Sequence, residues 1–422
     1  MALREVLFLI YHFPPLGMGG VQRPLKFVKY LPVWGWRPLV LTVKPIRYFA
    51  LDATLLKEVP PEAKVIRTES LDFLRLSAFY PPNATQRFPQ IRRRAKPITD
   101  WLMIPDLSVG WLPFAVSMGL SIIRSRPIEA ILATAPPYTT HVVGGLLARF
   151  TGLPLVLDYR DAWTFDSPRP FPTSFHRALN HFLERKSLIS ASRILAVNRT
   201  IARGLQTFFP PSKQDRVQTL SLGYDPEDFD DITISEASKF RITHVGTLIG
   251  ERSPKPLLSA LKRLFEERPE LRQKIEVRFV GLTRPEDQRM IYDSGLGDVV
   301  TCIPYLPHAE SISELLSAHT LYLTIGSGEG ETISTGKLYE YLGARKPIIA
   351  SAPSCEAAWT IEETKSGRVF HPEDNEGLAK EILRLYTLHN EGRLNGPSLE
   401  AVQRYDRQRL ARELARHLSE VA

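Results

Sequence analysis

The chain has 422 residues, and its 43% hydrophobic and 24% charged residues are ordinary for a globular protein, which excludes disordered and low-complexity classes. At about 150 residues per domain, this length predicts two or three domains. The two cysteines, Cys302 and Cys355, are too few for a disulfide scaffold or a cysteine-rich zinc site.

The formal net charge of +8 comes entirely from residues 1–110, which hold 16 Lys/Arg and 8 Asp/Glu, whereas the rest of the chain holds 38 of each. Within segment 87–103, four cations lie close to a tryptophan: Arg92, Arg93, Arg94, Lys96 and Trp101. Such a segment is typical of contact with an anionic membrane surface, and a solvated loop or helix face is the alternative. No nucleic-acid-binding motif is recognisable, so no nucleic-acid partner is expected.

The sequence predicts neither a membrane span nor secretion. The apolar run Val6–Tyr11 is too short for a signal peptide and has no cleavage site after it, so it is interpreted as a first strand. The longest stretches without Lys, Arg, Asp or Glu, Leu107–Ile123 and Ala130–Ala148, are interrupted by Pro113 and by a Pro-Pro pair. We therefore expect a cytoplasmic protein that can lie peripherally at the inner face of a membrane.

Strands and helices alternate along the N-terminal half. Apolar, β-rich segments predict strands at 6–11, 38–43, 130–133, 153–157, 193–197 and 217–220, and helical spacing predicts helices at 20–33, 139–150, 174–190 and 199–209. A long irregular stretch separates the second predicted strand from the third.

The C-terminal half repeats this alternation after a polar, acidic stretch, Tyr224–Lys239, that is interpreted as a linker. Strands are predicted at 241–245, 275–280, 299–303, 321–325, 347–350 and 368–370, and helices at 254–267, 309–317, 336–344, 374–390 and about 398–419.

Continuous apolar strands between helices indicate parallel sheets that are covered on both faces. The sequence therefore predicts an α/β fold of two Rossmann-like doubly wound domains, residues 1–222 and 223–397, facing each other across a cleft. Residues 398–422 are expected to form a C-terminal helix that crosses back to the first domain. Because open parallel sheets bind ligands at the carboxyl ends of their strands, residues that follow strands are the candidates for a site.

Two segments of the N-terminal half carry such candidates. Gly17, Gly19 and Gly20 follow the first strand, where glycines let backbone amides approach an oxygen-rich group. Their spacing differs from the dinucleotide fingerprint, and no acidic residue ends the second strand, which argues against NAD. Arg160 and Asp161 follow the strand 153–157 and are expected to line the cleft. A plain turn and a structural ion pair are the alternatives.

In the C-terminal half, one helix begins with features that suit a diphosphate. Thr335, Gly336, Lys337 and Leu338 form its first turn, where unpaired amides and a partial positive charge attract anions. Glu340 lies one turn further along, and a carboxylate there can accept hydrogen bonds from two neighbouring ribose hydroxyls. A surface glutamate on an ordinary helix is the alternative.

A second loop of this half can meet the same diphosphate. Thr247, Arg252 and Lys255 follow its first strand, and Arg offers a planar fork to phosphate oxygens. The motifs of serine hydrolases, zinc proteases and P-loop nucleotidases do not occur, and neither a cofactor nor a metal is predicted. His141 lies near a strand end and is a catalytic candidate, with a core or capping role equally open.

Together these segments resemble the glycosyltransferases of family 4, which have the GT-B fold. Five segments carry the resemblance in the family's order: YHFPPLGMGGVQRPLKFVKYLPVWGWRPLVLT, TAPPYTTHVVGGLLARFTGLPLVLDYRDAW, SLGYDPEDF, VGTLIGERSPKPLLSAL and TGKLYEYLGARKPIIAS. The resemblance covers residues 1–390, and 44–110 is its least distinctive part.

The resemblance implies a nucleotide-sugar donor, with UDP favoured, that is bound mainly by the C-terminal domain. Gly336 and Lys337 would lie beside the diphosphate, Glu340 on the ribose and Arg252 on a phosphate.

From the N-terminal domain, Gly19 and Gly20 would close over the donor, while Arg160 and Asp161 would line the acceptor side. The resemblance also implies transfer with retention of anomeric configuration, in which cations and a helix N-terminus stabilise the leaving diphosphate in place of a metal.

The chain departs from the family's pattern in three places. A glutamate often stands eight positions before the ribose-binding one, but Thr332 stands there; Glu331 and Glu329 are close by, and a one-residue difference in the loop would let Glu331 substitute. Thr247 replaces a usual arginine, and Leu222 replaces the linker's usual asparagine.

These observations support one main hypothesis and two alternatives. The main hypothesis is a retaining glycosyltransferase acting on a hydroxyl acceptor, a glycan or lipid-linked glycan in cell-surface polysaccharide assembly. The alternatives are a nucleotide-sugar 2-epimerase on the same fold and a non-catalytic GT-B partner of another transferase.

Overall fold

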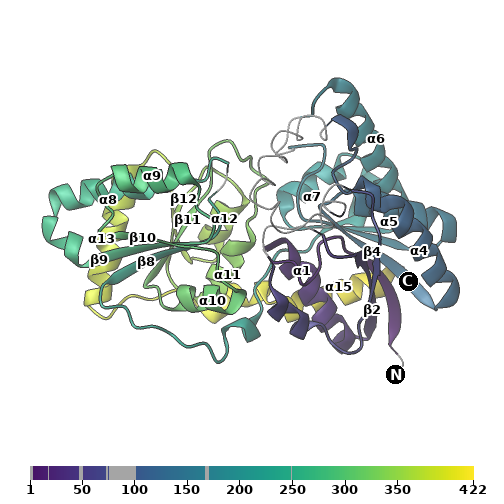
Figure 1. Ribbon diagram of the computed structural model, residues 1–422, viewed down its shortest axis with the longest axis horizontal. Coiled ribbons are helices and arrows are strands. Elements are labelled where there is room, and N and C mark those ends of the chain that lie inside the picture. Colours follow the sequence, from purple (N-terminus) through teal and green to yellow (C-terminus); the bar gives the residue numbers. More distant parts are fainter. Residues whose placement is uncertain are drawn as a thin grey trace. The chain divides into compact units, whose positions relative to one another are not determined.

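The computed structural model describes residues 3–17, 19–46, 51–72, 75, 101–166, 171–248 and 250–422. The chain divides into two compact units (Figure 1). Unit 1 consists of Met1–Ser221 and Arg407–Ala422, and unit 2 is Leu222–Asp406. The basic cluster Arg92–Arg94 with Lys96 lies outside the described residues.

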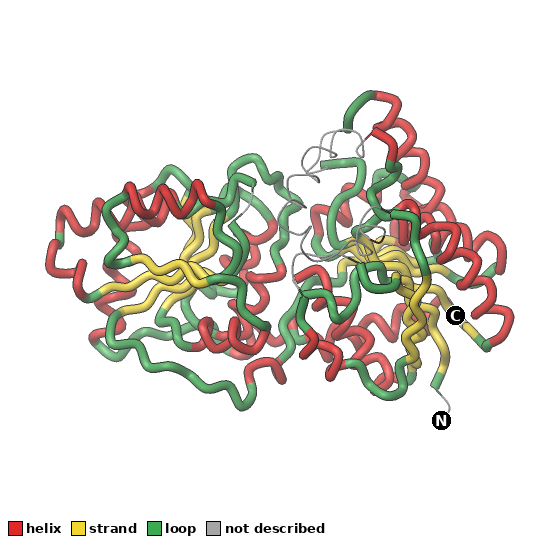
Figure 2. The backbone as a smooth tube through the Cα atoms, in the orientation of Figure 1, coloured by secondary structure: helices red, strands yellow, loops and turns green. Residues whose placement is uncertain are grey.

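Unit 1 contains a parallel sheet of seven strands among its described residues, in the order β3-β2-β1-β4-β5-β6-β7. The strands are β1 (Arg4–Leu9), β2 (Trp36–Val43), β3 (Lys64–Thr68), β4 (Ile128–Ala135), β5 (Leu155–Tyr159), β6 (Arg193–Ala196) and β7 (Val217–Thr219). Central strands such as β5 are buried along their whole length, because helices cover both faces of the sheet (Figure 2).

The helices of unit 1 form two layers. Those described are α1 (Gly19–Tyr30), α4 (Leu112–Ser125), α5 (Thr139–Thr151), α6 (Ser174–Ser190), α7 (Arg199–Gln206) and α15 (Arg407–Val421). Helix α5 packs between α4 and α6, whereas α1 packs against α15 (Figure 1). Right-handed crossovers place these helices on opposite faces of the sheet. The connections from β1 run towards β3 at one edge of the sheet, and those from β4 run towards β7 at the other.

Unit 2 contains a parallel sheet of six strands among its described residues, in the order β10-β9-β8-β11-β12-β13. The strands are β8 (Phe240–Val245), β9 (Ile275–Val280), β10 (Val300–Ile303), β11 (Thr320–Thr324), β12 (Ile348–Ser351) and β13 (Gly367–Phe370). The helices are α8 (Lys255–Glu267), α9 (Pro285–Asp293), α10 (His308–Leu316), α11 (Gly336–Ala344), α12 (Glu356–Glu363), α13 (Asn375–Asn390) and α14 (Leu399–Val402).

Two apolar clusters cover the two faces of this sheet. One contains residues of α8 and α13, and the other contains residues of α10, α11 and α12. The α/β fold class and its two doubly wound sheets are therefore as the sequence predicted.

Several elements differ from the prediction. The strand β3 and the helices α4, α9 and α12 were not predicted. Pro113 lies in the first turn of α4, where a missing amide hydrogen costs nothing, so the apolar stretch Leu107–Ile123 is divided at the start of this helix. None of the helices among the described residues is long and apolar enough to cross a membrane.

The prediction of one continuous C-terminal helix at 398–419 is wrong, because the segment is divided into two helices. Helix α14 ends at Val402, and Asp406 has an extended backbone (φ −65°, ψ 126°) before α15 begins. Helix α15 then packs against α1, and Trp36 Nε1 donates to Ser419 Oγ at 3.2 Å. The end of the chain thus belongs to unit 1.

Candidate functional site

In each unit, the candidate residues follow strands at the point where the chain connections reverse direction. In unit 1 this point lies between the neighbouring strands β1 and β4, and in unit 2 between β8 and β11. Loops that leave two such strands turn away from each other, and open parallel sheets bind their ligands there. Each unit therefore has its own candidate site, at the carboxyl ends of its strands.

In unit 2, helix α11 begins in the loop after β11. Thr335, the residue before the helix, has an extended backbone, and its side chain makes no capping bond. A Cβ on Gly336 would have no atom within 4 Å, so the start of the helix faces open space. Leu338 differs from the other candidates, because its side chain is fully buried and its amide donates to Thr335 O at 3.1 Å.

Glu340 lies one turn into α11 with both carboxylate oxygens engaged. Lys337 Nζ is 3.1 Å from Oε2, and His308 Nε2 is 3.5 Å from Oε1. The Glu340 side chain is 6% exposed. Burial alone would raise its pKa, but Lys337 and His308 outweigh burial and hold the pKa well below its usual range. Glu340 is therefore an ionised acceptor with a fixed orientation.

The loop after β8 reaches the same helix start. A Cβ on Gly246 would lie 3.7 Å from Lys337 Cγ and 3.1 Å from His244 Nε2. Gly281, at the end of the neighbouring strand β9, has φ +128°, and a Cβ there would collide with Gly246 O at 2.3 Å. The two glycines thus let the ends of β8 and β9 approach each other closely.

Further along this loop, Arg252 is held by an acidic residue. Its guanidinium forms a two-pronged ion pair with Glu329, with Nη2 2.6 Å from Oε2 and Nε 2.9 Å from Oε1. Gly326 N also donates to Glu329 Oε1 at 3.1 Å. The ion pair between Arg252 and Glu329 therefore joins the loop after β8 to the loop after β11. A phosphate could replace the Glu329 carboxylate in this pair.

The remaining candidates of unit 2 are more exposed. Thr247 is half-buried, and Lys255 is exposed as the first residue of α8. The Glu331 side chain is also exposed, and its carbonyl accepts the Glu356 amide at 3.1 Å. Glu329, and not Glu331, is therefore the glutamate of this loop whose carboxylate is bound to Arg252.

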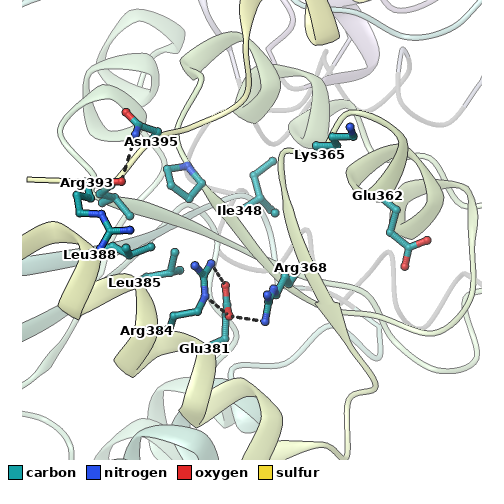
Figure 3. Close-up of a pocket in the computed structure, with 13 residues that line it drawn as sticks. Ile348, Glu362, Lys365, Arg368, Glu381, Arg384, Leu385, Leu388, Arg393 and Asn395 are labelled. Carbon is teal, nitrogen blue, oxygen red and sulfur yellow. Dashed lines mark hydrogen bonds and ion pairs between the residues drawn. The ribbon is translucent and has the colours of Figure 1, made fainter.

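A cavity of about 310 Å³ lies at the carboxyl ends of the strands of unit 2. Lys255 lines it, together with residues from the loop after β8, the end of β11 and the start of α13, which include Ser253, Thr324, Gly326 and Asn375. A larger cavity of about 470 Å³ lies at the amino ends of the strands, where β12 and β13 begin (Figure 3). There Glu381 pairs with Arg384 at 2.6 Å and Arg368 at 3.3 Å.

In unit 1, the glycines that follow β1 lie beside Arg160. Gly17 is buried, whereas Gly19 and Gly20 are exposed at the start of α1. Arg160 donates through Nε to Ala135 O at 3.1 Å, and through its other nitrogens to Gly20 O and Pro136 O. Its guanidinium thus ties together the loops after β1, β4 and β5, while the next residue, Asp161, is exposed.

His141 lies in the core of unit 1, one of the two roles that the sequence left open. Its side chain is fully buried, and Nε2 is 3.2 Å from Asp158 O. Its ring lies 4.4 Å from that of Tyr159. Burial lowers the pKa of His141 to about 4, so it is neutral at pH 7 and away from solvent.

Sequence reasoning missed residues that act on the candidates from a distance along the chain. His308 is separated from Glu340 by the whole of β11, and Glu329 comes from a loop without helical or strand pattern. In unit 1, the buried Arg23 of α1 pairs with Asp158 at 2.8 Å, and Thr134 donates to the same carboxylate at 2.7 Å. No local pattern marks such contacts.

Comparison with known proteins identifies a family domain and the fold. Residues 226–398, less than half of the chain, match the family model described as glycosyl transferases group 1. Among proteins of curated function, none matches the sequence.

Many solved structures share the fold. A glycosyltransferase from Rickettsia africae is similar with a TM-score of 0.64 at 14% identity, covering 99% of this chain and 98% of the other. Anabaena HepE in complex with UDP-glucose has a TM-score of 0.63 at 15% identity, covering 99% of each chain. A UDP-N-acetylglucosamine 2-epimerase from Listeria monocytogenes, named as putative in its description, has a TM-score of 0.56 at 12% identity, covering 100% and 98%. These likenesses show that the chain has the GT-B fold.

Proposed function

We infer that this chain, with its GT-B fold and its glycosyl transferases group 1 domain, transfers a sugar from a nucleoside-diphosphate sugar to a hydroxyl acceptor. One observation carries this inference: an open helix start at Gly336 lies one turn before an ionised, buried carboxylate, Glu340. The first suits a diphosphate and the second a ribose, so the pair matches the two parts of a nucleotide.

The donor is held by unit 2 in this proposal. The amides of Thr335 and Gly336 and the ammonium of Lys337 receive the diphosphate, and Glu340 accepts hydrogen bonds from the ribose hydroxyls. Arg252 exchanges its Glu329 partner for a phosphate, because both offer paired oxygens to the same guanidinium fork. UDP is the favoured nucleotide, and a nucleotide-sugar complex of a protein with the same fold agrees with this choice.

Unit 1 supplies the acceptor side. Gly19 and Gly20 are proposed to contact the donor, because they let its sugar or phosphate approach the backbone closely, and Arg160 keeps this loop in place through Gly20 O. Asp161 is the exposed carboxylate of this candidate site and is proposed to bind an acceptor hydroxyl.

Transfer proceeds with retention in this proposal. The acceptor oxygen bonds to the anomeric carbon on the face from which the diphosphate leaves, while the bond between that carbon and the phosphate oxygen breaks. The acceptor proton passes to the departing phosphate oxygen. Lys337, Arg252 and the positive end of α11 stabilise the charge that develops on this oxygen.

A direct test measures nucleotide binding by calorimetry with UDP, GDP, ADP and TDP. We expect one nucleotide to bind, and Glu340→Gln to weaken that binding. Glu381→Gln is a matched control, because Glu381 is also a buried carboxylate with two cationic partners but lies near the amino ends of the strands of the same sheet. Equal affinity of wild type and Glu340→Gln would contradict the proposed donor site.

One observation favours a second candidate, a non-catalytic partner of another transferase. The cation proposed for the phosphate is already neutralised by Glu329, which would suit a site that no longer binds a nucleotide. This candidate predicts no calorimetric signal with any of the four nucleotides. The 2-epimerase alternative predicts interconversion of a nucleotide sugar without an acceptor.

A further inference from the structure

Helix α6 of unit 1 buries an unusually polar face. Its buried face carries the polar side chains His176, Asn180, Glu184 and Ser187, with Leu188 as the apolar exception. A surface helix ordinarily buries its apolar stripe and exposes its polar one. The polar face therefore has a specific role inside the protein, while three of the apolar side chains of α6, Phe175, Phe182 and Ile189, are exposed.

The buried polar side chains hold the loop that follows Arg160 and Asp161. Asn180 Oδ1 accepts the indole N–H of Trp163 at 3.0 Å, and Glu184 accepts the hydroxyl of Thr164. Trp163 is buried and stacks on Tyr138, with ring centroids 4.7 Å apart. The inner face of α6 thus fixes the acceptor-side loop.

Three large apolar side chains lie along the outer face. Phe175, Phe182 and Ile189 are 67%, 53% and 57% exposed. They are spaced by seven residues, which is nearly two turns, so they form a line about 20 Å long on the crest of the helix. We call these three residues the α6 ridge.

Another exposed apolar pair lies near the N-terminal end of α6. Trp101 is 57% and Leu102 is 72% exposed. The Trp101 ring meets the edge of His176 at 4.9 Å, and Trp101 O is 3.1 Å from His176 Nε2. His176 belongs to the first turn of α6, so the pair lies at the same end of the helix as Phe175.

Cations flank the ridge on both sides. Arg185 and Lys186 are exposed and lie on either side of the crest, and Lys186 Nζ is 5.4 Å from the ring centre of Phe182. Arg177 is a third exposed cation, and Glu184, the one acidic residue of α6, is buried. Among the residues of α6 itself, the exposed charges beside the ridge are all positive, which complements a surface of negative charge.

We propose that the α6 ridge, with Trp101 and Leu102, inserts into the surface of an anionic lipid bilayer. A convex crest of Phe and Ile enters the boundary between headgroups and acyl chains, while the flanking cations meet lipid phosphates. This combination supplies the two signals, apolar and electrostatic, that stable peripheral binding needs. If the proposed function holds, the same helix places the acceptor-side loop at the membrane, where a lipid-linked acceptor is delivered.

The test is flotation of the full chain with vesicles of phosphatidylcholine containing 30% phosphatidylglycerol. We expect binding that falls at least about tenfold in the triple variant Phe175→Ser, Phe182→Ser, Ile189→Ser. Because these side chains are exposed, the fold is expected to persist. The control is Tyr292→Ser, which removes an 83% exposed aromatic from unit 2 and should leave binding unchanged.

A second variant tests the charge. Arg185→Gln with Lys186→Gln should weaken binding to anionic vesicles, whereas Lys262→Gln, an exposed lysine of unit 2, should not. Failure of the wild type to bind, or full binding by the ridge variant, would overturn the proposal. So would a wild-type dimer that the ridge variant abolishes without any vesicle binding. Nucleotide calorimetry on the ridge variant separates this result from the proposed function, because UDP binding should be unchanged.

Discussion

The replacement of Glu340 by Gln tests the donor site at a single atom. Gln has the same size but retains one acceptor oxygen, and its second position becomes an NH2 group that cannot accept a ribose hydroxyl. A hydrogen bond to a charged group contributes about 1.5–3 kcal/mol, so the loss of one raises the Kd for UDP roughly 10- to 150-fold. Because Lys337 and His308 hold the pKa of Glu340 below its usual range, the effect should be the same between pH 5 and 8.

The assay is a double-mutant cycle by calorimetry, with UDP and 2′,3′-dideoxy-UDP titrated into wild type and Glu340→Gln. If Glu340 binds the ribose hydroxyls, the variant should lose less than about threefold with the dideoxy nucleotide, because the partner atoms are already missing. Glu381→Gln should bind both nucleotides as the wild type does. An equal loss with both nucleotides would refute the assignment of Glu340 to the ribose.

Three further outcomes follow from the structure. Glu329→Gln should tighten binding of UDP but not of uridine, by up to about tenfold, because Arg252 then lacks a competing carboxylate; calorimetry with both ligands checks this. Gly336→Ala should raise the free energy of unfolding by roughly 0.4–1 kcal/mol, since no atom would lie near the added Cβ, and should still weaken UDP binding. Thermal unfolding checks the first effect and calorimetry the second, and lower stability or unchanged UDP binding would contradict the prediction. Burial raises the pKa of Glu184 to about 7. The folded state therefore retains a proton that the unfolded state has lost, and stability should fall by about 3 kcal/mol as the pH rises from 4.5 to 7; denaturant titrations should show this slope in wild type but not in Glu184→Gln.

The fold could be predicted from the sequence because its signal is local. Strands such as β5 are buried along their whole length and mostly apolar, and their alternation with helices favours parallel sheets. The elements that were missed have weaker patterns. The edge strand β3 is only half-buried, and helix α9 buries just Asp287 and Ile291, so neither shows a strong apolar period.

The candidate site was partly predictable for the same reason. Gly336, Lys337 and Glu340 belong to one helix start, and their order along the chain already indicates their chemistry. His308 and Glu329 could not be found in this way. Glu340, the partner of His308, belongs to another helix, and Arg252, the partner of Glu329, belongs to a loop that comes close only because β8 and β11 are neighbours. Similarly, Arg160 acts through the carbonyls of distant residues, which no side-chain pattern records.

The central claim, sugar transfer from a nucleotide sugar, is tested most directly by following nucleoside-diphosphate release from UDP-sugars in the presence of a membrane lipid extract as acceptor source. The account predicts release by the wild type and by Glu381→Gln, release by Glu340→Gln that is about 10- to 150-fold slower at donor concentrations well below the Kd, and a sugar in the lipid fraction whose anomeric configuration matches that of the donor. Conversion of the nucleotide sugar to its 2-epimer without diphosphate release, or equal release by Glu340→Gln, would contradict it.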